Sequence, residues 1–204
     1  MISNEKLIIL DIWRKNPFID YSISEIMKLM KKNTKTWVFN KLKEISKLNL
    51  IEVRKKSNLN LYSLNLNNPK TFQILYYLDI INTINFSQNK IINEIINNVP
   101  GFYVLLVFGS YANNNFNKKS DIDICFLIEN KSEINKIKPY LKDIKLNYAI
   151  EIDEHFILFK EFIKMLIVDE ENLAKQVVRK HILFYNGEIY YKLLIEAYKN
   201  GFRL

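Results

Sequence analysis

Apolar and polar residues follow two different periods along this chain, and the change between them divides the sequence. Up to about residue 100, apolar residues recur every three or four positions, which is typical of amphipathic helices. Residues 50–65 interrupt this pattern, because there apolar residues alternate around a polar tip at 55–58, as in a β-hairpin. From residue 103, short apolar runs typical of strands alternate with helical segments. The pattern predicts an α+β protein whose first part is mostly helical.

The first 67 residues predict three helices and then the hairpin. The first helix ends before Pro17, because proline disfavours helical geometry in the residue that precedes it. The second starts near Ser22 or Ser24, either of which is a suitable N-cap. The third runs from about residue 34 to 48, and its buried stripe is expected to be Val38, Leu42 and Ile45.

Most of the excess positive charge lies in this first part. The chain carries a net charge of +8, and residues 1–67 hold 13 Lys and Arg against 6 Asp and Glu, whereas residues 68–204 hold 17 against 16. Such asymmetry indicates a polyanionic partner for the basic part, unless it reflects only a composition rich in lysine.

The order of three helices and a hairpin resembles the winged helix-turn-helix domain of prokaryotic DNA-binding regulators. In that family the third helix enters the major groove and the hairpin, or wing, lies along the backbone. The resemblance implies contacts with double-stranded DNA, unless the module serves dimerisation or protein docking instead. The residues that it places at the DNA are Lys35, Thr36, Asn40 and Lys43 on the helix and Arg54, Lys55 and Lys56 on the wing.

Two further helices are predicted in residues 68–100, where Pro69 stands at a position suited to a helix start. Both helices have apolar faces, so the segment must pack on something. It either lies against the second domain or pairs with its copy in a homodimer, and the sequence leaves both open.

The remainder of the chain predicts a small sheet with helices packed on it. Strands are expected at 103–108, 121–128 and within 147–159, a helix at 132–144, and two mostly helical segments at 160–180 and 188–202.

The stretch "VFGSYANNNFNKKSDIDICFLI", residues 107–128, holds the candidate chemistry. Gly109 directly after a strand lets the backbone bring its N–H groups close to an anion, and Ser110 adds a hydroxyl donor. Asp121 and Asp123 are two apart on a strand and therefore share a face. Their mutual repulsion is relieved by a divalent cation, and Mg²⁺ prefers carboxylate and phosphate oxygens. This pattern predicts a site for a magnesium-bound triphosphate, to which the loop residues 118–119, both lysine, add charge unless they are merely solvated.

Gly109-Ser110, followed about ten residues later by Ser120-Asp121-Ile122-Asp123, resembles the polymerase-β-like nucleotidyltransferase superfamily. The likeness is greatest to its minimal nucleotidyltransferases, which include antitoxin partners in toxin and antitoxin pairs. The close resemblance covers about residues 103–128. It implies that Gly109, Ser110 and Ser120 bind the nucleotide and that Asp121 and Asp123 are catalytic and hold Mg²⁺.

The same resemblance implies a third carboxylate on a following strand, within an apolar-acid-apolar triplet. Residues 150–152 fit this triplet, which makes Glu151 the expected third metal ligand and catalytic residue. Asp153 falls on the same strand face and is the alternative. Minimal members commonly continue Gly-Ser-x-Ala with Arg-Gly, whereas asparagine occupies positions 113–114 here. The phosphate tail therefore lacks one expected positive charge.

Three other residues are predicted to have structural roles. Cys125 lies in an apolar run and is expected to be a buried, reduced thiol. His155 and His181 are expected to be structural, since transfer through two metal ions does not require a histidine. The longest apolar run, 102–108, is far shorter than the roughly 20 residues of a membrane-spanning helix, and no signal peptide pattern is present, so we expect a cytoplasmic protein.

The sequence predicts three parts: a winged helix-turn-helix domain at 1–67, a helical connector at 68–100, and a nucleotidyltransferase domain with a small mixed sheet at 101–204. The leading hypothesis is a magnesium-dependent nucleotidyltransferase that moves AMP from ATP to an unidentified hydroxyl. One form of this hypothesis places the hydroxyl on a partner protein. The alternatives are a non-catalytic DNA-binding regulator whose second domain senses a nucleotide, and an antitoxin-like protein that binds a toxin partner.

Overall fold

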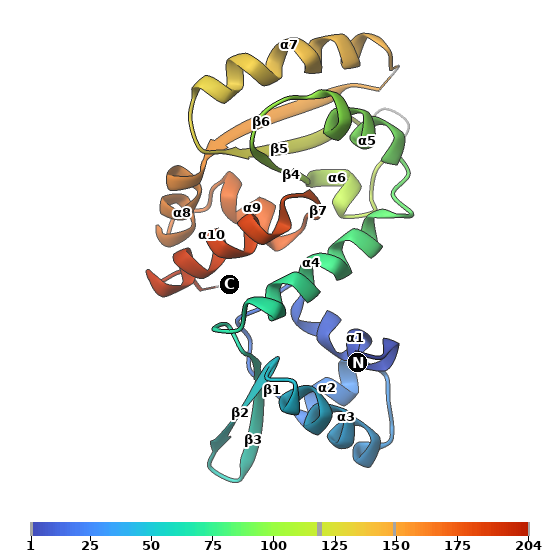
Figure 1. Ribbon diagram of the computed structural model, residues 1–204, viewed down its shortest axis with the longest axis vertical. Coiled ribbons are helices and arrows are strands. Elements are labelled where there is room, and N and C mark those ends of the chain that lie inside the picture. The colour runs from blue at the N-terminus through green and yellow to red at the C-terminus, as the bar shows by residue number, and fades with distance from the viewer. Residues whose placement is uncertain (1, 118–119, 149, 204) are drawn as a thin grey trace. The chain divides into compact units, whose positions relative to one another are not determined.

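The computed structural model describes residues 2–117, 120–148 and 150–203, and the chain divides into two compact units between Leu78 and Asp79 (Figure 1). The division falls inside helix α4 (Pro69–Thr83), which begins at the proline that the sequence indicates. Each unit has its own secondary structure and its own sheet.

The first unit consists of three helices and a small antiparallel sheet. Its helices are α1 (Asn4–Leu10), continued by a 3₁₀ turn at Asp11–Trp13, α2 (Ile23–Leu29) and α3 (Lys35–Lys47). The hairpin strands β2 (Ile51–Lys56) and β3 (Leu59–Leu64) follow. Ser22 caps α2 in a capping box with Glu25, which decides between the two predicted caps. The buried stripe of α3 is Val38, Leu42 and Ile45, as predicted.

One strand of this unit was not expected. The two-residue strand β1 (Tyr21–Ser22) pairs with the outer side of β3 and completes the sheet order β1-β3-β2. Two residues are too short to show a strand period in the sequence. The three helices and the hairpin are confirmed.

The second unit is built on a four-stranded mixed sheet with the order β6-β5-β4-β7. The central strands β4 (Tyr103–Val107) and β5 (Ile122–Ile128) are antiparallel, β5 and β6 (Ile152–Leu158) are parallel, and β7 (Ile182–Tyr185) is antiparallel to β4. The predicted α+β fold with a small mixed sheet is thus confirmed.

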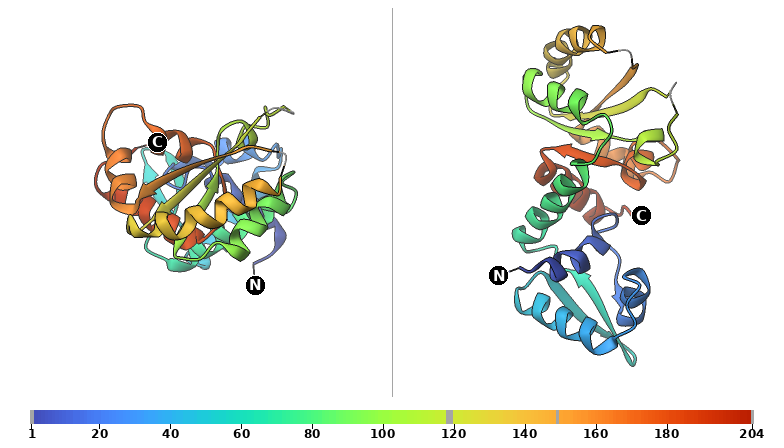
Figure 2. Two further views of the ribbon diagram at one scale, coloured as in Figure 1. Left: turned by 90° about the horizontal axis from the view of Figure 1, so that it is seen from above. Right: turned by 90° about the vertical axis from the view of Figure 1, so that its right-hand side faces the viewer.

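Helices cover both faces of this sheet (Figures 1 and 2). On one face, α5 (Asn89–Asn98) and α7 (Ser132–Leu146) pack in one apolar core with alternate residues of β5, among them Ile122, Ile124 and Phe126. On the other face lie α8 (Phe159–Ile167), α9 (Leu173–Arg179) and α10 (Gly187–Lys199). Because α5 buries Ile91, Ile92 and Ile95 in this core, half of the predicted connector is part of the second unit.

The C-terminal part differs from the prediction in two places. Residues 182–185, expected to lie between helical segments, form β7 because they hydrogen-bond to the open edge of β4. The predicted helical segment 160–180 is broken at residues 168–172 into α8 and α9. The Asn172 side chain accepts a hydrogen bond from the Lys175 N–H and starts the second of these helices.

Candidate functional site

The chain turns sharply where β4 ends, directly beside the start of β5. The Phe108 N–H donates to the Asp123 carbonyl (3.0 Å), and the short helix α6 (Gly109–Ala112) begins at once. Gly109 has φ +64°, and a Cβ built on it lies 1.9 Å from Asp123 Oδ2. No side chain fits in this space, so the glycine is required by the carboxylate as well as by the backbone conformation.

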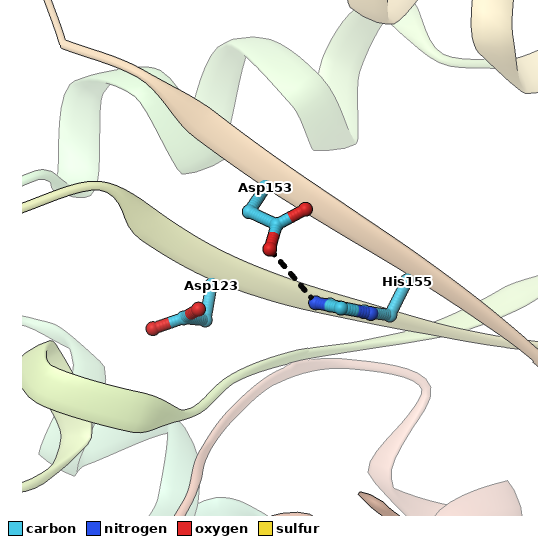
Figure 3. A group of neighbouring side chains, drawn as sticks. All are labelled: Asp123, Asp153 and His155. Atoms are coloured by element: carbon cyan, nitrogen blue, oxygen red, sulfur yellow. Dashed lines mark hydrogen bonds and ion pairs between the residues drawn. The ribbon is translucent and has the colours of Figure 1, made fainter.

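The parallel pairing of β5 and β6 sets two aspartates side by side. Its register places Asp123 opposite Asp153 and Cys125 opposite His155. Residues directly opposite each other in adjacent strands project to the same face, so Asp123, Asp153 and His155 converge (Figure 3). One ligand atom of each of these three residues lies within 4.8 Å of the others, which is the spacing of a metal-binding group. We call these three residues the Asp-Asp-His group.

Hydrogen bonds and ring contacts hold the Asp-Asp-His group in place. His155 Nε2 lies 3.1 Å from Asp153 Oδ2, and the imidazole meets the Phe108 ring edge-on with 5.4 Å between ring centroids. The Ser110 backbone N–H donates to the Asp123 carboxylate. The group is therefore supported by the turn after β4 as well as by its own strands.

Burial and neighbouring negative charges oppose the ionisation of Asp123. Burial raises the pKa of Asp123 above its usual range, and the negative charges of Asp121 and Asp153 raise this pKa further. His155 and the Ser110 N–H act in the opposite direction. A divalent cation is the natural relief for carboxylates held together in this way, so the donor set fits a metal ion.

The predicted ligand Asp121 lies just before β5 and is exposed. Its charge reaches Asp123, but it stands outside the compact Asp-Asp-His group that the described residues form. An Asp121 carboxylate that binds the same cation would therefore approach this cation from the solvent side.

The predicted third carboxylate, Glu151, also stands outside this group. Its carbonyl accepts a hydrogen bond from the Ile122 N–H (2.9 Å), and its exposed side chain lines a surface pocket of about 310 Å³ with Lys145 and Tyr148. Asp153, the alternative, is the acid that pairs with Asp123. The strand face left the choice open, and the register favours Asp153.

The two predicted serines have different surroundings. The Ser110 hydroxyl is buried and has no hydrogen-bond partner among the described residues, so it is an unsatisfied donor beside Asp123. The Ser120 hydroxyl accepts a hydrogen bond from the Asn117 N–H (2.9 Å). The loop lysines 118–119 lie outside the described residues.

The residues predicted to contact DNA are all exposed in the first unit: Lys35, Thr36, Asn40, Lys43, Arg54, Lys55 and Lys56. On α3, Thr36, Asn40 and Lys43 lie opposite the buried stripe, whereas Lys41 turns back to form ion pairs with Glu5 and Glu44.

The wing divides its three charges between two faces. Arg54 and Lys56 pair across the hairpin with Leu61 and Leu59, and Lys55 between them pairs with Asn60. Successive strand residues project to opposite sides, so one face of the wing carries two cations and the other carries one.

The histidine of the Asp-Asp-His group was not predicted as a site residue. The signal was present in the sequence, because Asp153 and His155 are two apart on a strand and so share a face. The other predicted structural residues behave as expected. His181 Nδ1 lies 3.0 Å from the Val177 carbonyl, and burial raises the pKa of Cys125, which keeps its thiol protonated.

Comparison with known proteins finds a similarity in the second unit. Residues 89–189 match the family model described as "Polymerase beta, Nucleotidyltransferase". Among curated proteins, none matches the chain. One solved structure, "Crystal structure of the toxin-antitoxin with AMP-PNP", is 19% identical and covers 56% of this chain and 83% of that chain, with a TM-score of 0.39. Within the described residues, no helix is both long enough and apolar enough to span a membrane.

Proposed function

Because residues 89–189 match the family model of the polymerase-β nucleotidyltransferases, we propose that the protein transfers AMP from ATP to a hydroxyl group. The observation that carries this proposal is the pairing of Asp123 with Asp153 beside the turn at Gly109. A metal-bound triphosphate needs paired carboxylates for the cation and close donors for the phosphates, and the buried, unpartnered Ser110 hydroxyl is such a donor.

The residues that would hold Mg²⁺ are Asp123 and Asp153, with Asp121 on the solvent side. When bound there, the cation supplies positive charge to the phosphates and lowers the pKa of the attacking hydroxyl. Asp123 and Asp153 orient the site through their fixed register. The buried Ser110 hydroxyl gains the acceptor that it lacks when it donates to a phosphate oxygen.

In the transfer, the acceptor oxygen forms a bond to the α-phosphorus of ATP. The bond from that phosphorus to the bridging oxygen breaks, pyrophosphate leaves with the bonding electron pair, and the proton of the hydroxyl passes to solvent water. We propose that the hydroxyl belongs to a partner protein. Asn113 and Asn114 follow α6, and neither contributes a positive charge to the phosphates.

The test is transfer of label from α-³²P-ATP and Mg²⁺ to proteins of a cell lysate by the full chain, with pyrophosphate release measured in parallel. Two neighbouring variants form a matched pair. Asp153→Asn is expected to abolish both signals, whereas Glu151→Gln is expected to retain them. If the wild type releases no pyrophosphate and labels nothing, the proposed reaction is wrong.

The missing positive charge favours one second candidate, a nucleotide sensor without catalysis. In that case ATP with Mg²⁺ raises the unfolding temperature, as any ligand of the folded state does, but no pyrophosphate forms. A binding-only, antitoxin-like role is distinguished by a stable complex with a toxin protein that is independent of ATP. A homodimer remains a prediction that sedimentation tests.

We further propose that the first unit is a winged helix that binds double-stranded DNA. The proposal rests on the exposed polar face of α3 and the cations of the wing. Lys43→Ala is expected to weaken binding and to reduce the slope of affinity against salt concentration by about one. Lys41→Ala is the matched control on the same helix, because its ammonium group is held by Glu5 and Glu44. Equal losses in both variants would contradict the assigned face.

A further inference from the structure

His155 gives the candidate metal site a nitrogen donor. The three side chains of the Asp-Asp-His group offer two carboxylate oxygens and one imidazole nitrogen, all within 4.8 Å of one another. The imidazole is partly exposed and meets the Phe108 ring edge-on. Its Nε2 atom lies at hydrogen-bond distance from Asp153 (Figure 3). Neither contact buries Nε2 in an apolar environment, so this atom is available to a cation between the two strands.

Donor type decides which divalent cation such a site prefers. Mg²⁺ takes oxygen ligands almost exclusively and keeps several of its waters. Imidazole nitrogen favours first-row transition cations over Mg²⁺. The affinity of a site with nitrogen and oxygen donors for these cations is lowest for Mn²⁺ and rises along the row to Cu²⁺. A group of three carboxylates would favour Mg²⁺, whereas replacement of one carboxylate by imidazole moves the preference toward transition cations.

We propose that Asp123, Asp153 and His155 Nε2 together bind a first-row transition cation such as Mn²⁺ in preference to Mg²⁺. This inference deepens the proposed function, because it concerns the cation of the same site. One feature outside the group indicates that the space beside it receives a ligand. The hydroxyl of Ser110, whose backbone N–H donates to the Asp123 carboxylate, is buried without a partner among the described residues.

The partners that His155 and Asp153 have before and after cation binding agree with this assignment. On cation binding, His155 exchanges its hydrogen bond to Asp153 for a bond from Nε2 to the metal, and the Asp153 carboxylate turns from the imidazole to the same ion. Both groups therefore keep a partner. A purely structural histidine would instead be satisfied by the backbone, as the part-buried His181 is at the Val177 carbonyl.

The test uses the full chain with Mn²⁺ alone, so that no nucleotide nitrogen is present. Pulsed electron paramagnetic resonance of the bound Mn²⁺ detects a directly coordinated ¹⁴N nucleus by its modulation of the echo. We expect this modulation in the wild type and its loss in His155→Asp, which keeps a charged oxygen ligand at that position. His181→Asn is the matched control, since His181 is the other histidine of the chain, and it should retain the signal.

Titration calorimetry with Mn²⁺ and with Mg²⁺ gives the second readout. His155→Asp is expected to lower the ratio of Mn²⁺ affinity to Mg²⁺ affinity by about tenfold or more. His155→Gln, a variant of neutral charge, should also lose the nitrogen modulation and covers the case in which the aspartate variant does not fold.

The outcomes separate this inference from the proposed function. Bound Mn²⁺ without nitrogen modulation in the wild type overturns the role of His155, and transfer from ATP with Mg²⁺ then still stands or falls in its own assay. Modulation that survives in both variants also overturns it, because the nitrogen comes from elsewhere. Absence of any Mn²⁺ binding overturns the inference as well.

Discussion

Substitution of Gly109 by alanine is the most direct test of the site geometry. The new Cβ would lie 1.9 Å from Asp123 Oδ2 and 2.7 Å from its Cγ, distances that no pair of atoms tolerates without movement. The residue also has φ +64°, which an L-residue adopts with strain. The variant therefore combines a backbone cost with a collision against one side chain.

The two costs can be estimated separately. A non-glycine residue in the left-handed region costs roughly 1–2 kcal/mol. Forcing additional volume into a packed site costs roughly 1–3 kcal/mol, here because the Asp123 carboxylate must leave the Asp-Asp-His group. We expect Gly109→Ala to lower the free energy of unfolding by roughly 2–5 kcal/mol, the sum of these ranges.

Urea denaturation followed by circular dichroism measures this loss, with Gly201→Ala as the matched control. Gly201 has φ +109°, and a Cβ there has no atom within 4 Å among the described residues, so that variant has only the backbone cost. The double variant Gly109→Ala/Asp123→Ala removes the colliding atoms, because the nearest remaining atom, the Cβ of residue 123, lies at 3.3 Å.

A double-mutant cycle then isolates the collision. The double variant should be more stable than the sum of the two single variants by roughly 1–3 kcal/mol, the estimated cost of the collision. If Gly109→Ala loses no more stability than Gly201→Ala, or if the two single losses simply add, the close approach of Gly109 to Asp123 is not real.

Three further predictions concern single side chains. Asp123→Asn should be more stable than the wild type at neutral pH without divalent cations, because the pKa of Asp123 is raised in the folded state and its charged form opposes folding. This gain in stability should shrink as the pH falls toward the range in which carboxyl groups are protonated. Urea denaturation at both pH values measures it, and a variant that is less stable than the wild type would contradict the sign. Ser110→Ala should leave the free energy of unfolding unchanged or raise it by up to about 1 kcal/mol, since its hydroxyl is unsatisfied, while weakening ATP binding in calorimetry; a clear loss of stability would reveal a partner. Ser22→Ala should cost about 1 kcal/mol in thermal unfolding through loss of the capping box, whereas Ser24→Ala should cost little; equal losses would argue against the cap.

Local patterns along the sequence were sufficient to predict most elements of the fold. Helix α3 follows from an apolar stripe on one face, and the hairpin follows from alternation around a polar tip. Strands β4 and β5 follow from short continuous apolar runs, and these strands are buried along almost their whole length. Strand β7 was missed because its four residues become a strand only by pairing with β4, more than 70 residues earlier in the chain. Pairing between distant segments has no signal in the local period.

The choice of the third acid shows the same limit. Glu151 and Asp153 share a strand face, so the period of two does not distinguish them. What distinguishes them is the register, set by the hydrogen bond from the Ile122 N–H to the Glu151 carbonyl and by the pairs that follow. Register depends on two strands at once, and neither strand alone contains it.

Strands β5 and β6 each have one face in the core and one face at the site. This arrangement restricts where residues can be inserted or deleted in homologous proteins. In β5, Ile122 and Ile124 fill the core under α5 and α7, while Asp123 between them faces the site. Loss or gain of one residue within either strand would turn acids into the core and isoleucines toward the face that carries the site, so the fold and the chemistry would be lost together. We expect inherited insertions and deletions to gather in the segments between the strands, such as residues 129–131.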